Sequence, residues 1–245
     1  MAPIFYWTTE LILTGLMYTY TSDKMIHIVE YNSEKYESHV AASLDKKYTL
    51  QEFSEMEGML VGINGGYHGY KSERGPLTKL SIDGNELVPT NDMTVLKKYG
   101  LKADNVNAVL SIDATHHHVS IGNEEGDSYI YSGPLLVEND VHTELNTKWS
   151  RVKNPRTIVC TKNNGASVLF VVIDGRQKDV FGMTLIEAQD LMDTIGCTDA
   201  INMDGGGSTS MYIIGKGIVN NPRSVGDDGK YITIERSVSS IIGIK

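Results

Sequence analysis

Short apolar segments of strand length dominate this chain and limit what it can fold into. Some of them alternate apolar and polar residues with the two-residue period of a half-buried strand, and others are short continuous apolar runs. They span residues 24–31, 59–63, 106–112, 127–131, 134–138, 156–161, 167–173, 199–203, 210–214 and 231–244. A chain with so many strands has to bury sheet faces against one another or against a few helices.

Two helices interrupt the strands. Thr49-Leu-Gln-Glu52 and Thr184-Leu-Ile-Glu187 are capping boxes, in which a threonine and a glutamate satisfy N–H groups of the first helical turn. After the second box, apolar residues form a helical stripe that Gly196 ends as a left-handed cap. The stripe consists of Leu185, Ile186, Ala188, Leu191, Met192 and Ile195.

These segments together predict an α+β fold, mostly strand, with two main helices packed on the sheet. The connections are short and contain no repeat or low-complexity linker, so we expect a single domain over residues 1–245, with residues 1–20 as a candidate N-terminal extension. With 40% hydrophobic residues, the chain can bury a substantial core without disulfides or structural metals. Cys160 lies in an apolar strand run and Cys197 just past a helix, so we expect two buried free thiols.

The charge and the N-terminal region exclude several partners. The net charge is −9 and no basic run occurs, which argues against nucleic acid, because affinity for it comes mainly from Lys and Arg on phosphates. The first twenty residues hold apolar stretches, but Glu10 and several threonines interrupt them and no Lys or Arg precedes them. We therefore expect no signal peptide, no membrane span and no membrane partner. Both a cytoplasmic address and a larger particle such as a phage stay open, as does the oligomeric state.

One loop is typical of a site. In residues 199–212 a strand runs directly into Asp204 and the glycines Gly205, Gly206 and Gly207, and Ser208 follows. Glycines remove every Cβ and permit positive φ, so a ligand can approach the backbone N–H groups while Asn202, Asp204 and Ser208 surround it. The structural alternative is a tight connection between strands.

His116-His-His118 is a weaker signal. Consecutive residues on a strand point to alternate faces, so His116 and His118 alone could share an ion, and no cysteine or carboxylate lies at ligand spacing nearby. We expect no metal there.

Several segments together resemble one family, the phosphodiester glycosidase domain, which also occurs in bacterial and phage proteins. They are Gly62-Ile-Asn-Gly-Gly-Tyr67, Ser132-Gly-Pro-Leu-Leu-Val137, Asn154-Pro-Arg-Thr157, Val171-Val-Ile-Asp-Gly-Arg176, Gly182-Met-Thr-Leu185 with Glu187, Asn202-Met-Asp-Gly-Gly-Gly-Ser208, Asn220-Asn-Pro222 and Glu235-Arg-Ser-Val-Ser-Ser240. Their order and spacing make the set specific. The chain departs from the family at Tyr67-His68, where another aromatic pair is usual.

The resemblance implies hydrolysis of a sugar-1-phosphodiester to free sugar and phosphomonoester, with a phosphorylated glycan as substrate. The leaving phosphomonoester has a second pKa near 6, so it needs less protonation than an alcohol, and cationic donors matter more. Arg156 and Arg236 match the family's motifs, and a guanidinium can bind phosphate oxygens in bidentate fashion. We expect both to line a phosphate subsite; the alternative for each is a surface salt bridge.

Carboxylates and amides complete the expected site. Asp204 and Asp174 each end a strand, and Glu187 lies in a motif but already has a capping role, so these three are the candidate catalytic carboxylates. Amides suited to sugar hydroxyls or phosphate oxygens, and the backbone beside them, are the remaining candidate substrate-binding positions. They are Asn64, Gly65, Gly66, Asn202 and Asn220, with Tyr67 close by.

Two other functions stay open. One is a phosphoglycan-binding module, such as a viral or cell-surface adhesin, whose carboxylate geometry does not support catalysis. The other is a metal-dependent phosphodiesterase, in which Asp174, Asp204 and Asn202 would hold Mg²⁺ or Ca²⁺ and the P–O bond would break. The glycosidase reading requires no cofactor.

Overall fold

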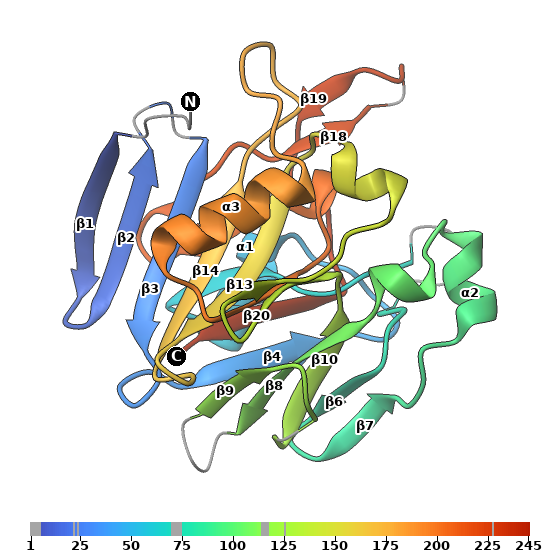
Figure 1. The fold of residues 1–245 in the computed structure, drawn as a ribbon, viewed down its shortest axis with the longest axis horizontal. Helices are drawn as coiled ribbons and strands as arrows, with labels where there is room; N and C mark the ends of the chain where they lie inside the picture. The colour runs from blue at the N-terminus through green and yellow to red at the C-terminus, as the bar shows by residue number, and fades with distance from the viewer. Residues whose placement is uncertain are drawn as a thin grey trace.

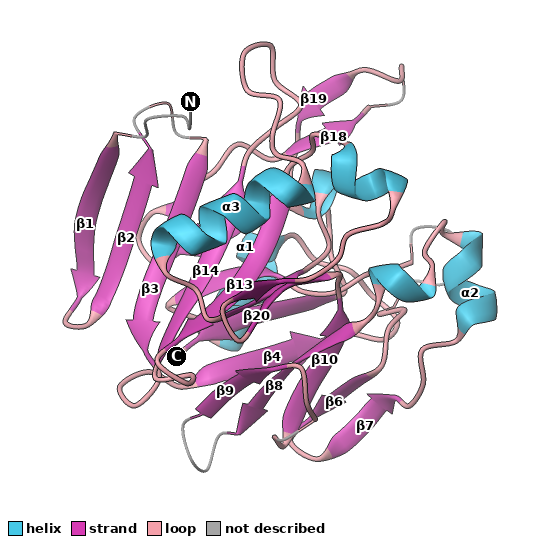
Figure 2. Cartoon of the chain, viewed as in Figure 1, coloured by secondary structure: helices cyan, strands magenta, loops and turns pink. Residues whose placement is uncertain are grey.

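The computed structural model describes residues 6–21, 23, 25–69, 75–113, 118–124, 126–226 and 228–245. Its strands form three larger sheets and one hairpin, and helices pack on them (Figure 1, Figure 2). The fold is α+β and mostly strand, as the sequence predicts. No helix of the described residues is both long and apolar enough to cross a bilayer.

The largest sheet has eight antiparallel strands in the order β1-β2-β3-β14-β13-β15-β11-β12. Their bounds are β1 Trp7–Leu13, β2 Leu16–Thr21, β3 Ile26–Asn32, β11 Leu135–Glu138, β12 Val141–His142, β13 Arg156–Lys162, β14 Ser167–Ile173 and β15 Asp199–Asn202. Strands β1 and β2 cover most of the candidate N-terminal extension, residues 1–20, and continue the sheet beyond β3. Strands β13 and β14 are buried along nearly all of their length, which explains their continuous apolar runs.

Two five-stranded sheets and a hairpin complete the strands. One sheet has the order β7-β6-β10-β8-β9, with bounds β6 Leu80–Ile82, β7 Asn85–Val88, β8 Ala108–Asp113, β9 His118–Ile121 and β10 Ser128–Ser132. The other has the order β17-β16-β5-β20-β4, with bounds β4 Ser38–Ala42, β5 Val61–Asn64, β16 Met211–Ile213, β17 Gly217–Ile218 and β20 Ser240–Ile244. The hairpin pairs β18 Arg223–Val225 with β19 Tyr231–Thr233. The predicted strand over 231–244 is therefore two strands, β19 and β20.

One apolar core joins the three sheets. It contains Val159 and Phe170 from the eight-stranded sheet, Leu110 from the second sheet, and Ile63 and Ile242 from the third. Helix α3 (Leu185–Ile195) covers the opposite face of the eight-stranded sheet, across β13 and β14 (Figure 1). The central strands β13 and β14 of this sheet are therefore packed on both faces.

Both predicted capping boxes are present. In α1 (Leu50–Glu57), Thr49 Oγ1 accepts the Glu52 N–H, and in α3, Thr184 Oγ1 accepts the Glu187 N–H. Gly196 ends α3 in the left-handed conformation, as predicted. Ile186 was placed in the buried stripe but is exposed. A third helix, α2 (Met93–Lys98), was not predicted; Asp92 caps its first turn, which carries no capping box.

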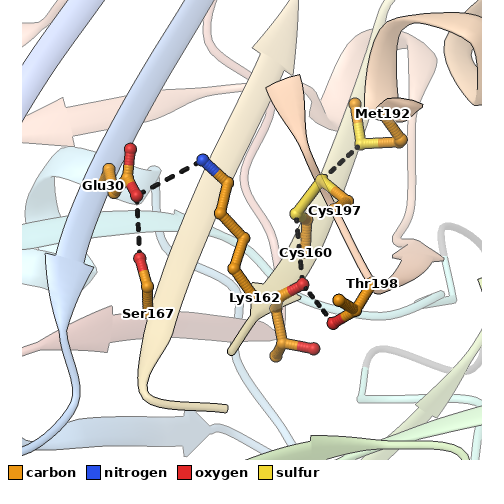
Figure 3. The surroundings of a disulfide bond; sticks show 8 residues. Glu30, Cys160, Lys162, Ser167, Met192, Cys197 and Thr198 are labelled. Carbon is orange, nitrogen blue, oxygen red and sulfur yellow. Dashed lines mark hydrogen bonds and ion pairs between the residues drawn. A yellow bond between two sulfur atoms is a disulfide. The ribbon is translucent and has the colours of Figure 1, made fainter. Parts of the chain in front are cut away.

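The expectation of two free thiols was wrong. Cys160 on β13 and Cys197 just after α3 form a buried disulfide with a Cα–Cα distance of 5.8 Å (Figure 3). Cys160 pairs with Ala200 of β15, and Cys197 begins the turn from α3 into that strand, so the end of the helix lies over the cysteine of the sheet. Two cysteines 37 residues apart meet only through this strand pairing, which the local pattern does not reveal.

The disulfide should contribute strongly to stability. The disulfide links residues 37 positions apart and so restricts the unfolded chain. A Cys160→Ala, Cys197→Ala double variant loses this restriction, and we expect the free energy of unfolding to fall by about 4 kcal/mol. Urea unfolding with and without a reductant measures this: reductant should destabilise the parent and leave the double variant unchanged. An equal effect of reductant on both proteins would contradict the prediction.

Candidate active site

A cavity of about 230 Å³ lies around the glycine-rich loop after β15. Seven of the predicted site residues line it: Arg156, Asn202, Asp204, Gly205, Gly206, Gly207 and Arg236. Tyr67, expected nearby, also lines it. Residues that were not predicted complete the wall: His68, Leu77, Tyr99, Leu101, Trp149, Asn154 and Arg176. One side of the cavity is therefore cationic and polar, and aromatic and aliphatic side chains form the rest.

Asp204 is held rigidly at this cavity. Its N–H donates to the Gly65 carbonyl at 3.2 Å, and its own carbonyl accepts the Asn64 side-chain amide at 2.6 Å. The Gly205 N–H donates to Asp204 Oδ1 at 2.9 Å, while Oδ2 lies 3.5 Å from Nδ1 of His68. The side chain keeps one-fifth of its surface exposed. It combines a fixed position with access to a ligand.

Asn64 and its neighbours support this geometry from behind. Asn64 is buried outside the cavity lining, and its Oδ1 accepts the Thr157 hydroxyl and the Ser210 N–H. Gly65 packs against β20, where a Cβ would lie 2.5 Å from the Ser240 hydroxyl. Gly66 is similarly enclosed. In this structure, the predicted binding positions Asn64, Gly65 and Gly66 do not line the cavity, and Asn64 and Gly65 instead hold the backbone of Asp204.

The three glycines of the loop have neighbours that explain them. A Cβ on Gly205 would lie 2.9 Å from the Pro155 carbonyl oxygen, and one on Gly206 would lie 2.7 Å from Nη2 of Arg176. On Gly207 it would lie 2.5 Å from Nη2 of Arg236. The N–H groups of Gly205 and Gly206 donate within the protein, to Asp204 Oδ1 and the Pro155 carbonyl. The glycines thus let guanidinium groups lie directly on the backbone.

Arg156 is the most deeply placed of the cavity arginines. Its Nε donates to the Met183 carbonyl, and its Nη2 donates to the carbonyls of Trp149 and Val152. Burial lowers the pKa of Arg156 to about 10, so the group stays charged at neutral pH. These contacts leave Nη1 as the part of the guanidinium that can meet a ligand.

Arg176 and Arg236 flank the loop on its other side. Arg176 Nε and Nη2 donate to Asn154 Oδ1, and its guanidinium lies 5.0 Å from the ring centre of Tyr231. Arg236 Nη2 donates to the Ser224 hydroxyl at 3.0 Å. Neither contact is with a carboxylate, so the salt-bridge alternative for Arg236 finds no support among the described residues.

The cavity lining carries net positive charge, whereas the whole chain is negatively charged. Among the described lining residues, three arginines face a single carboxylate, that of Asp204, although the chain carries a net charge of −9. Positive charge concentrated in a cavity of an acidic protein favours a compact anionic group.

Besides Asn64, Gly65 and Gly66, four more predicted site residues lie away from the cavity lining. Asp174 is buried, and its carboxylate accepts the Asn220 amide at 2.9 Å and the Asn221 N–H at 2.8 Å. Glu187 closes its capping box and pairs with Lys153 at 3.1 Å. Ser208 is also fully buried. The structure brings Asp204 together with the arginines but does not bring Asp174, Glu187, Ser208 or Asn220 into that lining.

Asn202 is the one predicted amide that lines the cavity. Its Nδ2 donates to the carbonyls of Gly133 and Met203, and Tyr67 donates its hydroxyl to the same Gly133 carbonyl. Its Oδ1 is buried and accepts no hydrogen bond from the described residues. This amide oxygen is free to accept a hydrogen bond from a ligand hydroxyl.

Two metal sites were considered from the sequence, one at Asp174, Asp204 and Asn202 and one at His116 and His118. Within the described ranges, no three His, Cys, Asp or Glu side chains gather as a metal-binding group. Asp174 does not line the cavity that holds Asp204 and Asn202. His116 lies outside the described residues, and the Nε2 of His118 is 3.2 Å from the Asn164 carbonyl oxygen.

Comparison with known proteins identifies the family. The family model for phosphodiester glycosidases matches residues 57–245. The chain belongs to the phosphodiester glycosidase family. A curated relative, the SPbeta prophage-derived protein YomE of Bacillus subtilis, is 30% identical over 96 residues, which are 38% of this chain and 15% of that protein. The chain therefore matches only a small part of that relative's length.

Solved structures show the same fold at low sequence identity. The catalytic domain of zebrafish N-acetylglucosamine-1-phosphodiester alpha-N-acetylglucosaminidase, auto-inhibited by its pro-peptide, has a TM-score of 0.71 and 18% identity, over 98% of this chain and 82% of that one. A hypothetical protein from Synechocystis has a TM-score of 0.66 and 12% identity, over 99% and 64% of the two chains. The family and the fold of this chain are those of a glycosidase enzyme.

Sequence reasoning missed two chemically important residues of this family member. Arg176 ends the motif Val171-Val-Ile-Asp-Gly-Arg176, just after β14, and an arginine directly after a strand end was a usable signal. Its positive φ of 60° turns the chain there. His68 follows the Gly65-Gly66 turn beside Tyr67, so its position next to a predicted binding segment was also visible. Only the fold shows that both meet Asp204 at one cavity.

Proposed function

We propose that this chain hydrolyses a sugar-1-phosphodiester at its C1–O bond, releasing free sugar and a phosphomonoester. The observation that carries the proposal is the meeting of Arg156, Arg176 and Arg236 with Asp204 around one cavity. The arginines can bind the phosphate, and the carboxylate can assist the reaction at the anomeric carbon beside it. Membership of the phosphodiester glycosidase family supports the same reaction.

The proposed reaction can proceed with Asp204 as the one carboxylate among the described lining residues. An ordinary glycoside needs an acid to protonate its leaving alcohol, and one of the two carboxyl groups that glycosidases usually supply is this acid. A phosphomonoester leaves as a stable anion, since its second pKa is near 6. Guanidinium groups that stabilise the developing negative charge can therefore replace the acid. The proposed reaction requires no cofactor.

The apolar wall suits the sugar. Trp149 lines the cavity with half of its surface exposed, and Tyr67, Tyr99 and Leu101 lie on the same lining. Aromatic faces bury the apolar surface of a ring while polar tips stay available for hydrogen bonds. The name of the zebrafish protein makes N-acetylglucosamine-1-phosphodiesters the first substrates to test.

Hydrolysis in water enriched with ¹⁸O tests the proposal. A panel of sugar-1-phosphodiesters should yield labelled sugar and unlabelled phosphomonoester. Label in the phosphate, with loss of activity on chelation, would instead favour a metal-dependent phosphodiesterase. Binding without turnover across the panel would favour a phosphoglycan-binding module.

A further inference from the structure

His68 lines the cavity and lies beside the fixed carboxylate. Its Nδ1 is 3.5 Å from Asp204 Oδ2, and the imidazole is 3% exposed. That nitrogen is buried and has no hydrogen-bond partner among the described residues. A buried polar atom without a partner needs an explanation, and here it faces the side chain proposed to act on the substrate.

The surroundings of His68 favour a neutral imidazole. Burial lowers its pKa below the ordinary value of 6.5, and the positive charges of Lys47 and Arg236 act in the same direction. Asp204 and the Gly66 backbone oppose this effect without cancelling it. At neutral pH the ring therefore carries a free lone pair that can accept a proton.

The proposed reaction leaves one proton unassigned. The phosphomonoester departs with the electron pair of the C1–O bond and needs no proton, but the water that attacks C1 has to lose one. Asp204 and His68 are direct neighbours, so they lie on one side of the reacting carbon. A retaining mechanism instead requires a nucleophile and a second acid–base group about 5 Å apart across the bond.

We infer that His68, whose unpaired Nδ1 lies beside Asp204, is the general base that takes this proton. Resting on the proposed function, the step is a single displacement: water oxygen bonds to C1, its proton moves to the imidazole, and the C1–O electron pair leaves with the arginine-bound phosphate. The displacement inverts the configuration at C1.

The stereochemical test uses the unaltered protein. Proton NMR during the first minutes of hydrolysis of an α-linked sugar phosphodiester should show the β-anomer of the free sugar before mutarotation. First appearance of the α-anomer overturns the inference and leaves the proposed function standing. Absence of sugar release across the panel overturns both.

A variant pair tests the role of the imidazole. His68→Gln should lower kcat by about 10²-fold, and it should abolish the fall of kcat/KM that the parent shows as pH drops below 6.5. The matched control is His142→Gln, which removes another histidine–aspartate pair, with Asp193 at 2.8 Å, on the surface. It should keep the parent's kcat and pH profile. A folded His68→Gln enzyme with the parental pH profile contradicts the inference.

Discussion

Asp204→Asn should lower kcat by at least about 10³-fold and leave the fold intact. Asparagine keeps an oxygen for the Gly205 N–H, and the backbone bonds from Asp204 to Gly65 and Asn64 do not involve the side chain. The negative charge beside His68 and the anomeric carbon is lost. Steady-state kinetics on a sugar phosphodiester, together with thermal unfolding, measure both effects.

The matched control for this change is Asp193→Asn. Asp193 also pairs with a histidine, but its side chain is half exposed and lies away from the cavity. It should leave kcat within about twofold of the parent. Activity of Asp204→Asn within about tenfold of the parent would show that Asp204 is not the catalytic carboxylate.

Arg236→Lys should remove the preference for phosphate-bearing substrates. The lysine keeps the charge but loses the planar fork, and we expect kcat/KM on the sugar phosphodiester to fall by about 10²–10³-fold. A nitrophenyl glycoside of the same sugar, whose leaving group carries no phosphate, should slow far less. Arg236 suits this test better than Arg156, because Arg156 also holds three backbone carbonyls and its loss would disturb the fold.

Arg151→Lys provides the control, because Arg151 is exposed and does not line the cavity. Both substrates should react with it as with the parent. Equal slowing of the two substrates by Arg236→Lys would mean that Arg236 does not bind phosphate, and a structural role on Gly207 would then explain it.

Much of the fold was predictable because its signals are local. The capping boxes at Thr49 and Thr184 satisfy N–H groups within one turn, so sequence alone places both helix starts. Helix α2 begins at Met93, after the cap Asp92, without a capping box, and is only six residues long, which leaves little periodicity to detect. The disulfide was missed for a different reason: it depends on β13 pairing with β15, which is tertiary information.

The candidate site was likewise predictable where its signals are local and not where they depend on tertiary contacts. Asp204, Arg156 and Arg236 lie in motifs whose residue types already suggest phosphate and sugar chemistry, and all three line the cavity. Asp174 has an equally suggestive place at a strand end, yet Asn220 and Asn221 occupy its carboxylate. The sequence shows which polar groups a chain contains, but not which of them are already hydrogen-bonded within the fold. Residues that bind a ligand and residues that position others therefore cannot be distinguished from sequence alone.

Because of Asn64, the site can form only after two of the sheets have packed together. Its side chain joins the end of β5, Thr157 of β13 and the carbonyl of Asp204, so it bridges two different sheets. Neither sheet alone can hold the carboxylate in place. During refolding, turnover should therefore return later than strand content does, and a separation of the two sheets would silence the enzyme while most of its backbone hydrogen bonds persist.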